Sequence, residues 1–514
     1  MKSMSSKSIA FAKRPFSLIF LAVVVIFLIS ANKAWFYHRI DVSSGQYWVL
    51  DYPPNVPFMW QYDKDANAQL GSTAFFPDYY KIQPHLIDRP TMQAASWLIG
   101  RGVSIVVSPI LHAQSMQSIV DKGIDMIRDS DLSSLYGNQE ITRGEALHFL
   151  SRYISGAGGL IIFKIVLYCV GGLMMFHLVR YYSDKDVALF SVLFLFTNGY
   201  MVNAIGTYHN YEFQVITPIV VLYLFHQLCI RYSISKNILF SIIIGLLFMA
   251  KANYAAYVGV LLFSLFFIRE RRLLLTAIPL SIIFHSLPWL AWHIYLEATG
   301  SGILGFTSGQ PLVGRAPLLH PYSIITSALL VGEVNQQNAA LPGDWFSLLR
   351  GEAFASPATA TIALLKILIT KVSATLKVYG SFVGFLAVIG LFILQSQKNG
   401  RLIGLMLGCL FLGSLIQVLA SYPAADMWHN RFVYDPFFVI YGLASYSIFH
   451  FLSLQTPQRK KFVILTAVLF ISLSTTILNK AKIPWVHPFD QKGFYSLIDA
   501  NSKFRSVITP TSAS

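Results

Sequence analysis

Two aspartates in a polar segment are the candidates for a catalytic carboxylate. Asp63 and Asp65 lie in the sequence Tyr62-Asp63-Lys64-Asp65, downstream of the first apolar stretch of the chain. A carboxylate beside a bilayer acts as a general base toward a hydroxyl group when it lies within hydrogen-bond reach of it. The alternative is an ordinary solvated loop, which a bare Asp-Lys-Asp pattern also fits.

Three basic residues could hold a phosphate group near these carboxylates. Lys251 interrupts an apolar run, and ionisable residues at membrane depth are costly and usually functional. Arg431 precedes a late apolar stretch, and Arg89 precedes Pro90, a residue that suits the first turn of a helix. The alternatives are a lysine that extends from a hairpin tip to the interface and arginines that anchor helices there.

His209 and Glu212 share a short polar turn and, with Tyr62, are the candidates for binding a substrate. A structural role for the His209–Glu212 pair is the competing interpretation. No glycine-rich phosphate loop, Ser-His-Asp spacing or His/Cys metal cluster is visible in the sequence, so we expect neither a metal ion nor another cofactor.

The composition requires a membrane to hold these residues. The chain has 514 residues, of which 55% are hydrophobic and 12% charged, and its mean hydropathy is +0.56. A soluble domain carries about 25% charged residues. The net charge of +15 lies in short connections, with no basic soluble domain for nucleic acid. Cys169, Cys229 and Cys409 fall in apolar runs, which argues against a disulfide framework.

Apolar stretches predict an all-α, multi-pass transmembrane bundle of about eleven spans, since each is suited to crossing the bilayer as a helix. The first is interpreted as an uncleaved span. The predicted spans are residues 16–31, 157–179, 187–205, 213–230, 238–250, 254–268, 273–295, 378–394, 402–420, 432–451 and 462–478. Residues 92–111 contain Arg101 and Pro109 and are predicted to form one or two helices on the membrane surface. Residues 130–152 are predicted to form a solvated insertion.

Charge predicts the orientation. With the N-terminus in the cytoplasm, every inner connection is basic, as the positive-inside rule requires. These connections are residues 180–185, 231–236, 269–272, 398–401 and 459–461. The long loops then share the outer face of a cell membrane, which we expect to be a bacterial inner membrane. The predicted organisation is a tail and first span at 1–31, an extracytoplasmic loop with surface helices at 32–155, a transmembrane bundle at 156–296, a second loop with an interfacial helix at 297–377, further spans at 378–478 and an extracytoplasmic tail at 479–514.

In the order of these features the chain resembles the GT-C-fold glycosyltransferases, the polytopic class that includes protein O-mannosyltransferases and aminoarabinose transferases. The resemblance lies in Tyr62-Asp63 in a large first outer loop, Asp88-Arg89-Pro90 before a surface helix, the break at Lys251, and the sequence Arg431-Phe432-Val433-Tyr434-Asp435-Pro436 before a late span.

The resemblance implies transfer of a hexosyl or pentosyl group from a polyprenyl-phosphate donor to a lipid, glycan or protein acceptor on the extracytoplasmic face, with inversion. Asp63 would be the base, and Asp65 a second acid or the base itself. Lys251 and Arg431, with Arg89, would hold the departing phosphate. The alternatives are a transporter or flippase of lipid-linked glycans, a glycan polymerase or ligase, and a non-catalytic scaffold.

Overall fold

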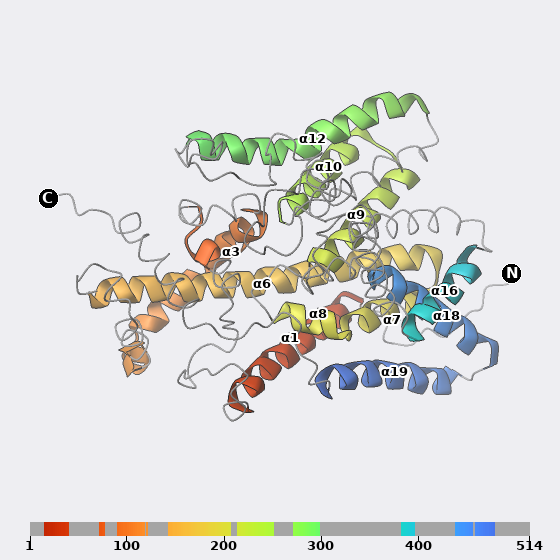
Figure 1. Ribbon diagram of the computed structural model, residues 1–514, viewed down its shortest axis with the longest axis horizontal. Coiled ribbons are helices and arrows are strands. Elements are labelled where there is room, and N and C mark those ends of the chain that lie inside the picture. The colour runs from red at the N-terminus through yellow and green to blue at the C-terminus, as the bar shows by residue number, and fades with distance from the viewer. Residues whose placement is uncertain are drawn as a thin grey trace, which may run out of the picture. The chain divides into compact units, whose positions relative to one another are not determined.

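The computed structural model describes ten segments of the chain, and all of its regular elements are helical. The described residues are 15–40, 71–77, 90–118, 120–121, 142–206, 213–250, 271–298, 382–395, 437–455 and 458–478. Within these segments there are eleven α-helices, one 3-10 helix and no strand (Figure 1). The all-α class predicted from the sequence is therefore confirmed for the described residues.

The helices divide between two compact units. Unit 1 comprises Met1–Ile19, Val170–Leu195 and Phe213–Phe470, and unit 2 comprises Phe20–Cys169, Phe196–Glu212 and Ile471–Ser514. The helices, in chain order, are α1 (Pro15–Ile40), α3 (Pro90–His112), η4 (Gln114–Met116), α6 (Arg143–Tyr182), α7 (Lys185–Phe196), α8 (Gly199–Ile205), α9 (Phe213–Ile230), α10 (Ile234–Phe248), α12 (Arg271–Ala298), α16 (Phe382–Gln395), α18 (Phe437–Gln455) and α19 (Gln458–Leu478).

Helix α6 is the longest described element and contributes to both units. Its 40 residues give it a length of about 60 Å, twice the thickness of a bilayer's hydrocarbon core. Its first ten residues correct the prediction of a solvated insertion at 130–152, because residues 143–152 already belong to the helix. The sequence Arg143-Gly144-Glu145 opens it, and Arg143 forms an ion pair with Asp121 at 2.7 Å.

In unit 2, the N-terminal part of α6 packs against α8 and α3. The side chains of Lys164 and Tyr168 reach the carbonyls of Ala204 and Met201, so α6 and α8 run in opposite directions. Helix α3 meets α6 through small residues. A Cβ atom added to Gly159 would lie 2.1 Å from the carbonyl oxygen of Ser96, which means that the two backbones are in direct contact.

In unit 1, two pairs of helices run parallel. The C-terminal part of α6 lies along α9, because Gly171 faces Ile216 and, further along both helices, Tyr181 faces His226. Helix α10 lies along α12, because Asn237 contacts Ala277 and Gly245 contacts His285. The α10–α12 pair is fixed by two buried hydrogen bonds of Asn237, which donates to the carbonyl of Ala277 at 3.0 Å and accepts from the Ser281 hydroxyl at 2.9 Å.

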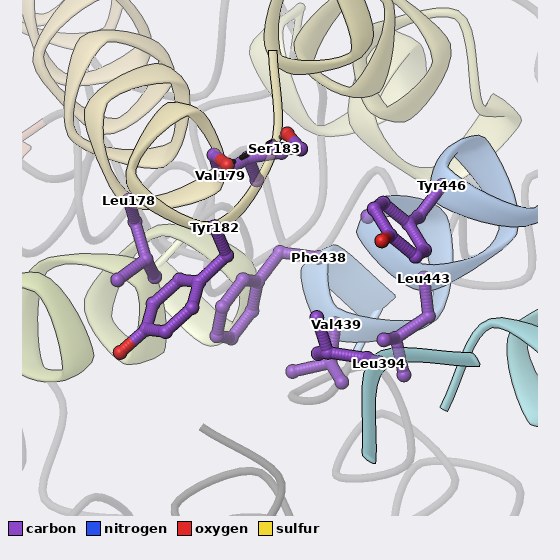
Figure 2. Close-up of a pocket in the computed structure, with 10 residues that line it drawn as sticks. Leu178, Val179, Tyr182, Ser183, Leu394, Phe438, Val439, Leu443 and Tyr446 are labelled. Atoms are coloured by element: carbon purple, nitrogen blue, oxygen red, sulfur yellow. Dashed lines mark hydrogen bonds between the residues drawn. The ribbon is translucent and has the colours of Figure 1, made fainter. Parts of the chain in front are cut away.

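Helices α16 and α18, also in unit 1, run in opposite directions. The Ser447 hydroxyl donates to the carbonyl of Leu386, while Leu394, at the far end of α16, lies against Val439 (Figure 2). Strict alternation of the predicted spans makes these two helices parallel. The structure therefore differs from the predicted order at this pair. A close approach at Gly390, where an added Cβ would lie 2.2 Å from the Leu443 carbonyl, holds the pair together.

Two described helical segments are long and apolar enough to cross a membrane, Pro90–His112 and Ser151–Tyr182. Six shorter apolar helices accompany them, at Pro15–Ser30, Val215–Ile230, Ile234–Phe248, Thr276–Trp292, Phe382–Leu394 and Phe438–Leu452. The predicted span 187–205 is broken in two, since α7 ends at Phe196 and α8 begins at Gly199. Asn198 and Gly199 are poor helix formers, which accounts for the break.

Candidate functional site

The eight residues predicted to form the site all lie outside the described segments. They are Tyr62, Asp63, Asp65, Arg89, His209, Glu212, Lys251 and Arg431. The structure does, however, describe the chain immediately beside several of them. These neighbouring segments limit how far each predicted residue lies from the helices.

The first-loop aspartates are tethered to α6 through residues 71–77. A Cβ atom on Gly156 of α6 would lie 2.9 Å from the Cα of Ala74, and the Arg152 guanidinium stands 4.7 Å from the centre of the Phe75 ring. Asp65 precedes Gly71 by six residues, which span at most about 22 Å of extended chain. Asp65 is therefore confined to the surroundings of the outer part of α6 that begins near Arg152.

Arg89 is tethered to the same part of α6 through α3. Pro90 is the first residue of α3, as predicted from the sequence, so Arg89 is joined directly to this helix. Ser96 lies about 9 Å further along α3 and is in contact with Gly159 of α6. The neighbouring contact repeats the pattern, since a Cβ on Gly100 would lie 2.8 Å from the Ser155 carbonyl oxygen.

His209 is tethered to α6 through α8. The Lys164 ammonium donates to the carbonyl oxygen of Ala204 at 3.2 Å, and the Tyr168 hydroxyl donates to that of Met201 at 2.9 Å. Both side chains are fully buried, with 1% of Lys164 and none of Tyr168 exposed. His209 follows Gly206 by three residues, at most about 11 Å of chain.

Lys164 is the residue that our interpretation of the sequence missed. It is a lysine in the apolar sequence Ile161-Ile162-Phe163-Lys164-Ile165, and its buried position interrupts one of the two membrane-length segments. A lone charged residue inside such a run was the available signal, because burying an ammonium group is costly unless a partner compensates. The Ala204 carbonyl supplies one such partner.

The segments next to Asp65, Arg89 and His209 thus all contact one stretch of α6, between Arg152 and Lys164. This stretch is about 18 Å long. Lys251 follows directly on the turn Met249–Ala250 that ends α10, and it belongs with Arg431 to unit 1.

The basic connections at the other helix ends carry a second group of charges. Asp184 caps α7, its carboxylate accepting the backbone N–H groups of Asp186 and Val187 at 2.9 and 2.8 Å. Burial, with the nearby Asp184, raises the pKa of the Asp186 carboxyl above its ordinary value, whereas Lys461 and Lys185 act in the opposite direction. These groups stabilise a turn, and nothing about them resembles a substrate site.

A small apolar pocket lies within unit 1, between the C-terminal end of α6, α16 and α18. Its volume is about 60 Å³, and the rings of Tyr182 and Phe438 lie next to each other in it (Figure 2). Among the described residues no group of three or more His, Cys, Asp or Glu side chains could hold a metal ion. Comparison with models of known protein families, with curated protein sequences and with solved structures found no match.

Proposed function

We propose that this chain is a multi-pass membrane glycosyltransferase that moves one sugar from a polyprenyl-phosphate donor to a lipid, glycan or protein acceptor at the extracytoplasmic face. The observation that carries the proposal is the convergence of three tethers on one stretch of α6. The segment after Asp65, the helix that follows Arg89 and the helix end before His209 all pack between Arg152 and Lys164.

Helix directions support a multi-pass arrangement. Alternation of the predicted spans requires α6 and α8 to be antiparallel, and it requires α6 and α9, and likewise α10 and α12, to be parallel. The contacts agree with the requirement in all three pairs. The pair α16–α18 departs from it, so the number of crossings between residues 396 and 436 is the part of the topology that needs an independent test.

The length of α6 supports a position for the site at the outer boundary of the membrane. Arg180 belongs to a basic inner connection, and Gly159 precedes it by 21 residues, or about 31 Å of helix. That distance equals the thickness of the hydrocarbon core. The contacts between α3 and α6 therefore begin where the core ends, which favours α3 as a helix at the outer interface, although its length is sufficient for a crossing.

The chemistry follows from the predicted roles. The carboxylate of Asp63, or of Asp65, takes the proton of the acceptor hydroxyl as its oxygen attacks the anomeric carbon of the sugar from the face opposite the phosphate. A bond forms between the acceptor oxygen and the anomeric carbon, and the bond from that carbon to the phosphate oxygen breaks. Arg89, Lys251 and Arg431 would stabilise the charge on the polyprenyl phosphate that leaves. His209, Glu212 and Tyr62 would bind the sugar or acceptor.

The experiment that tests this proposal compares envelope glycans of cells with and without the protein by mass spectrometry. We expect one class of glycan to lose the mass of a single sugar when the protein is absent. Restoring the wild-type gene should return that mass, and Asp63→Asn should not. The matched control is Asp121→Asn, since Asp121 lies in the same polar region but forms an exposed ion pair that contributes at most about 1 kcal/mol. Full restoration by a stably inserted Asp63→Asn protein rules out Asp63 as the base.

A second candidate function, transport or flipping of a lipid-linked glycan, is favoured by Lys164. Ionisable residues buried within a spanning helix are typical of transport pathways, and Lys164 is 1% exposed. A transporter would change the side of the membrane on which a glycan lies without changing its mass. The same mass spectra therefore separate the two candidates.

A further inference from the structure

The C-terminal end of α8 is fixed by three contacts from two other helices of unit 2. Lys164 and Tyr168, one turn apart on α6, each donate a hydrogen bond to a backbone carbonyl near that end. On α1, the Ser30 side chain lies against Gly206, where an added Cβ would come within 1.9 Å of the Ser30 hydroxyl oxygen. Ser30 is itself buried, with 6% exposed. We call these contacts the α8 clamp.

The α8 clamp has a physical basis in how helices end. The last carbonyls of a helix have no donor within the helix, and in an apolar environment each needs one from elsewhere. Ala204 lies in the last turn of α8, and the Lys164 ammonium supplies its donor. An apolar residue would fill the position of Lys164 without the desolvation of an ammonium group. The chain instead carries a lysine there, whose long side chain connects two helices at a defined distance.

We propose that Lys164 and Tyr168 are positioning residues, which hold the start of the polar segment 207–212 and with it His209 and Glu212. The segment begins at Gly206, one residue after α8, so a displacement of the helix end is passed directly to it. Tyr168 reinforces the hold from one turn away, where its ring also packs against Phe196 at 5.6 Å between centroids. The assignment of this segment to a sugar site rests on the proposed function. The α8 clamp itself does not.

A spin label on Asn210 tests the α8 clamp without any assumption about activity. Asn210→Cys is made in a full-length chain in which Cys169, Cys229 and Cys409 are replaced by alanine, labelled with a nitroxide and placed in lipid nanodiscs. We expect Lys164→Met to increase the mobility of the label, and Lys164→Arg, which keeps a long cationic donor, to leave it close to the starting spectrum. A label at Ser235, in the connection before α10, is the matched control and should not respond.

Tyr168→Phe keeps the test decisive if Lys164→Met does not fold. It removes one hydroxyl and preserves the ring, and we expect it to loosen the label on Asn210 to a smaller extent. An unchanged spectrum at Asn210 in both variants contradicts the α8 clamp. Equal loosening at Asn210 and Ser235 contradicts it too, because that pattern indicates general destabilisation.

The positioning role is tested by steady-state transfer with a polyprenyl-phosphate-linked sugar. We expect Lys164→Met to raise KM for the sugar donor about tenfold, which corresponds to about 1.4 kcal/mol, with a smaller change in kcat and with recovery in Lys164→Arg. A loosened label with unchanged KM refutes the positioning role. If the wild-type protein transfers no sugar, the proposed function fails, and the label experiment alone decides whether the α8 clamp exists.

Discussion

Replacement of Gly159 by alanine tests the contact between α3 and α6, on which the tether of Arg89 depends. The new Cβ would lie 2.1 Å from the Ser96 carbonyl oxygen and 2.6 Å from the Gly100 nitrogen. The first distance is about 1.3 Å short of the 3.4 Å at which ordinary van der Waals contact begins. Both neighbours are backbone atoms, so they cannot rotate away, and the helices must separate. Overpacking of this kind costs about 1–3 kcal/mol.

Helix propensity acts in the opposite direction, and this gives the experiment its control. Alanine is about 1 kcal/mol more favourable than glycine inside a helix, so Gly159→Ala should have a net cost of up to about 2 kcal/mol. Gly102→Ala, on α3, meets no atom within 4 Å and should instead stabilise the protein slightly. Thermal unfolding in nanodiscs measures both. If Gly159→Ala raises the melting temperature as Gly102→Ala does, the close approach of α3 and α6 is wrong.

Three further predictions concern unit 1. Because α16 and α18 are antiparallel, Asn399→Cys and Gln458→Cys should react with an impermeant thiol reagent from opposite sides of the membrane; labelling from the same side would support strict alternation of the spans instead. Asn237→Leu should lower the melting temperature by several degrees, because the Ser281 hydroxyl and the Ala277 carbonyl lose their partner and each unsatisfied buried group costs about 1–3 kcal/mol; an unchanged melting temperature would contradict the α10–α12 contact. The raised pKa of Asp186 means that folding favours its protonated form, so its contribution to stability is present in acid and lost as pH rises through the folded pKa; Asp186→Asn should therefore stabilise the protein at neutral pH and have little effect in acid, and the reverse order would refute the assignment.

Periodicity and apolar length were sufficient to predict where several helices lie. Helix α9 occupies the predicted residues, Phe213–Ile230, and α12 extends the predicted span by two or three residues at each end. Local chemistry explains one of the shifts. Helix α10 begins four residues early because Ser233 caps it, its side chain accepting the backbone N–H of Lys236 at 3.3 Å.

Contacts between helices could not be predicted in the same way. Lys164 carries a visible signal, a charge in an apolar run, but its partner Ala204 is 40 residues away and is an ordinary backbone carbonyl. The antiparallel pairing of α16 with α18 depends on a close approach at Gly390, whereas hydropathy registers only that both segments are apolar. The extension of α6 to Arg143 was missed because its first ten residues are polar.

The candidate site was predicted from residue types alone, and its eight residues remain predictions. What the structure adds is a set of distances along the chain, from Asp65 to Gly71, from Arg89 to Pro90 and from His209 to Gly206. Each ends on a segment that contacts α6 between Arg152 and Lys164. A single sequence does not contain this information, because each of the three contacts joins segments far apart in the chain.

The most direct measurement is a transfer reaction with purified protein in nanodiscs, supplied with polyprenyl-phosphate-linked sugars and a lipid extract that contains the acceptor. We predict that the wild-type protein releases one polyprenyl phosphate for each sugar gained by an acceptor, with inversion at the anomeric carbon, and that Asp63→Asn loses this activity while its melting temperature is unchanged. Movement of the donor across the bilayer with no gain of mass on any acceptor would contradict the account.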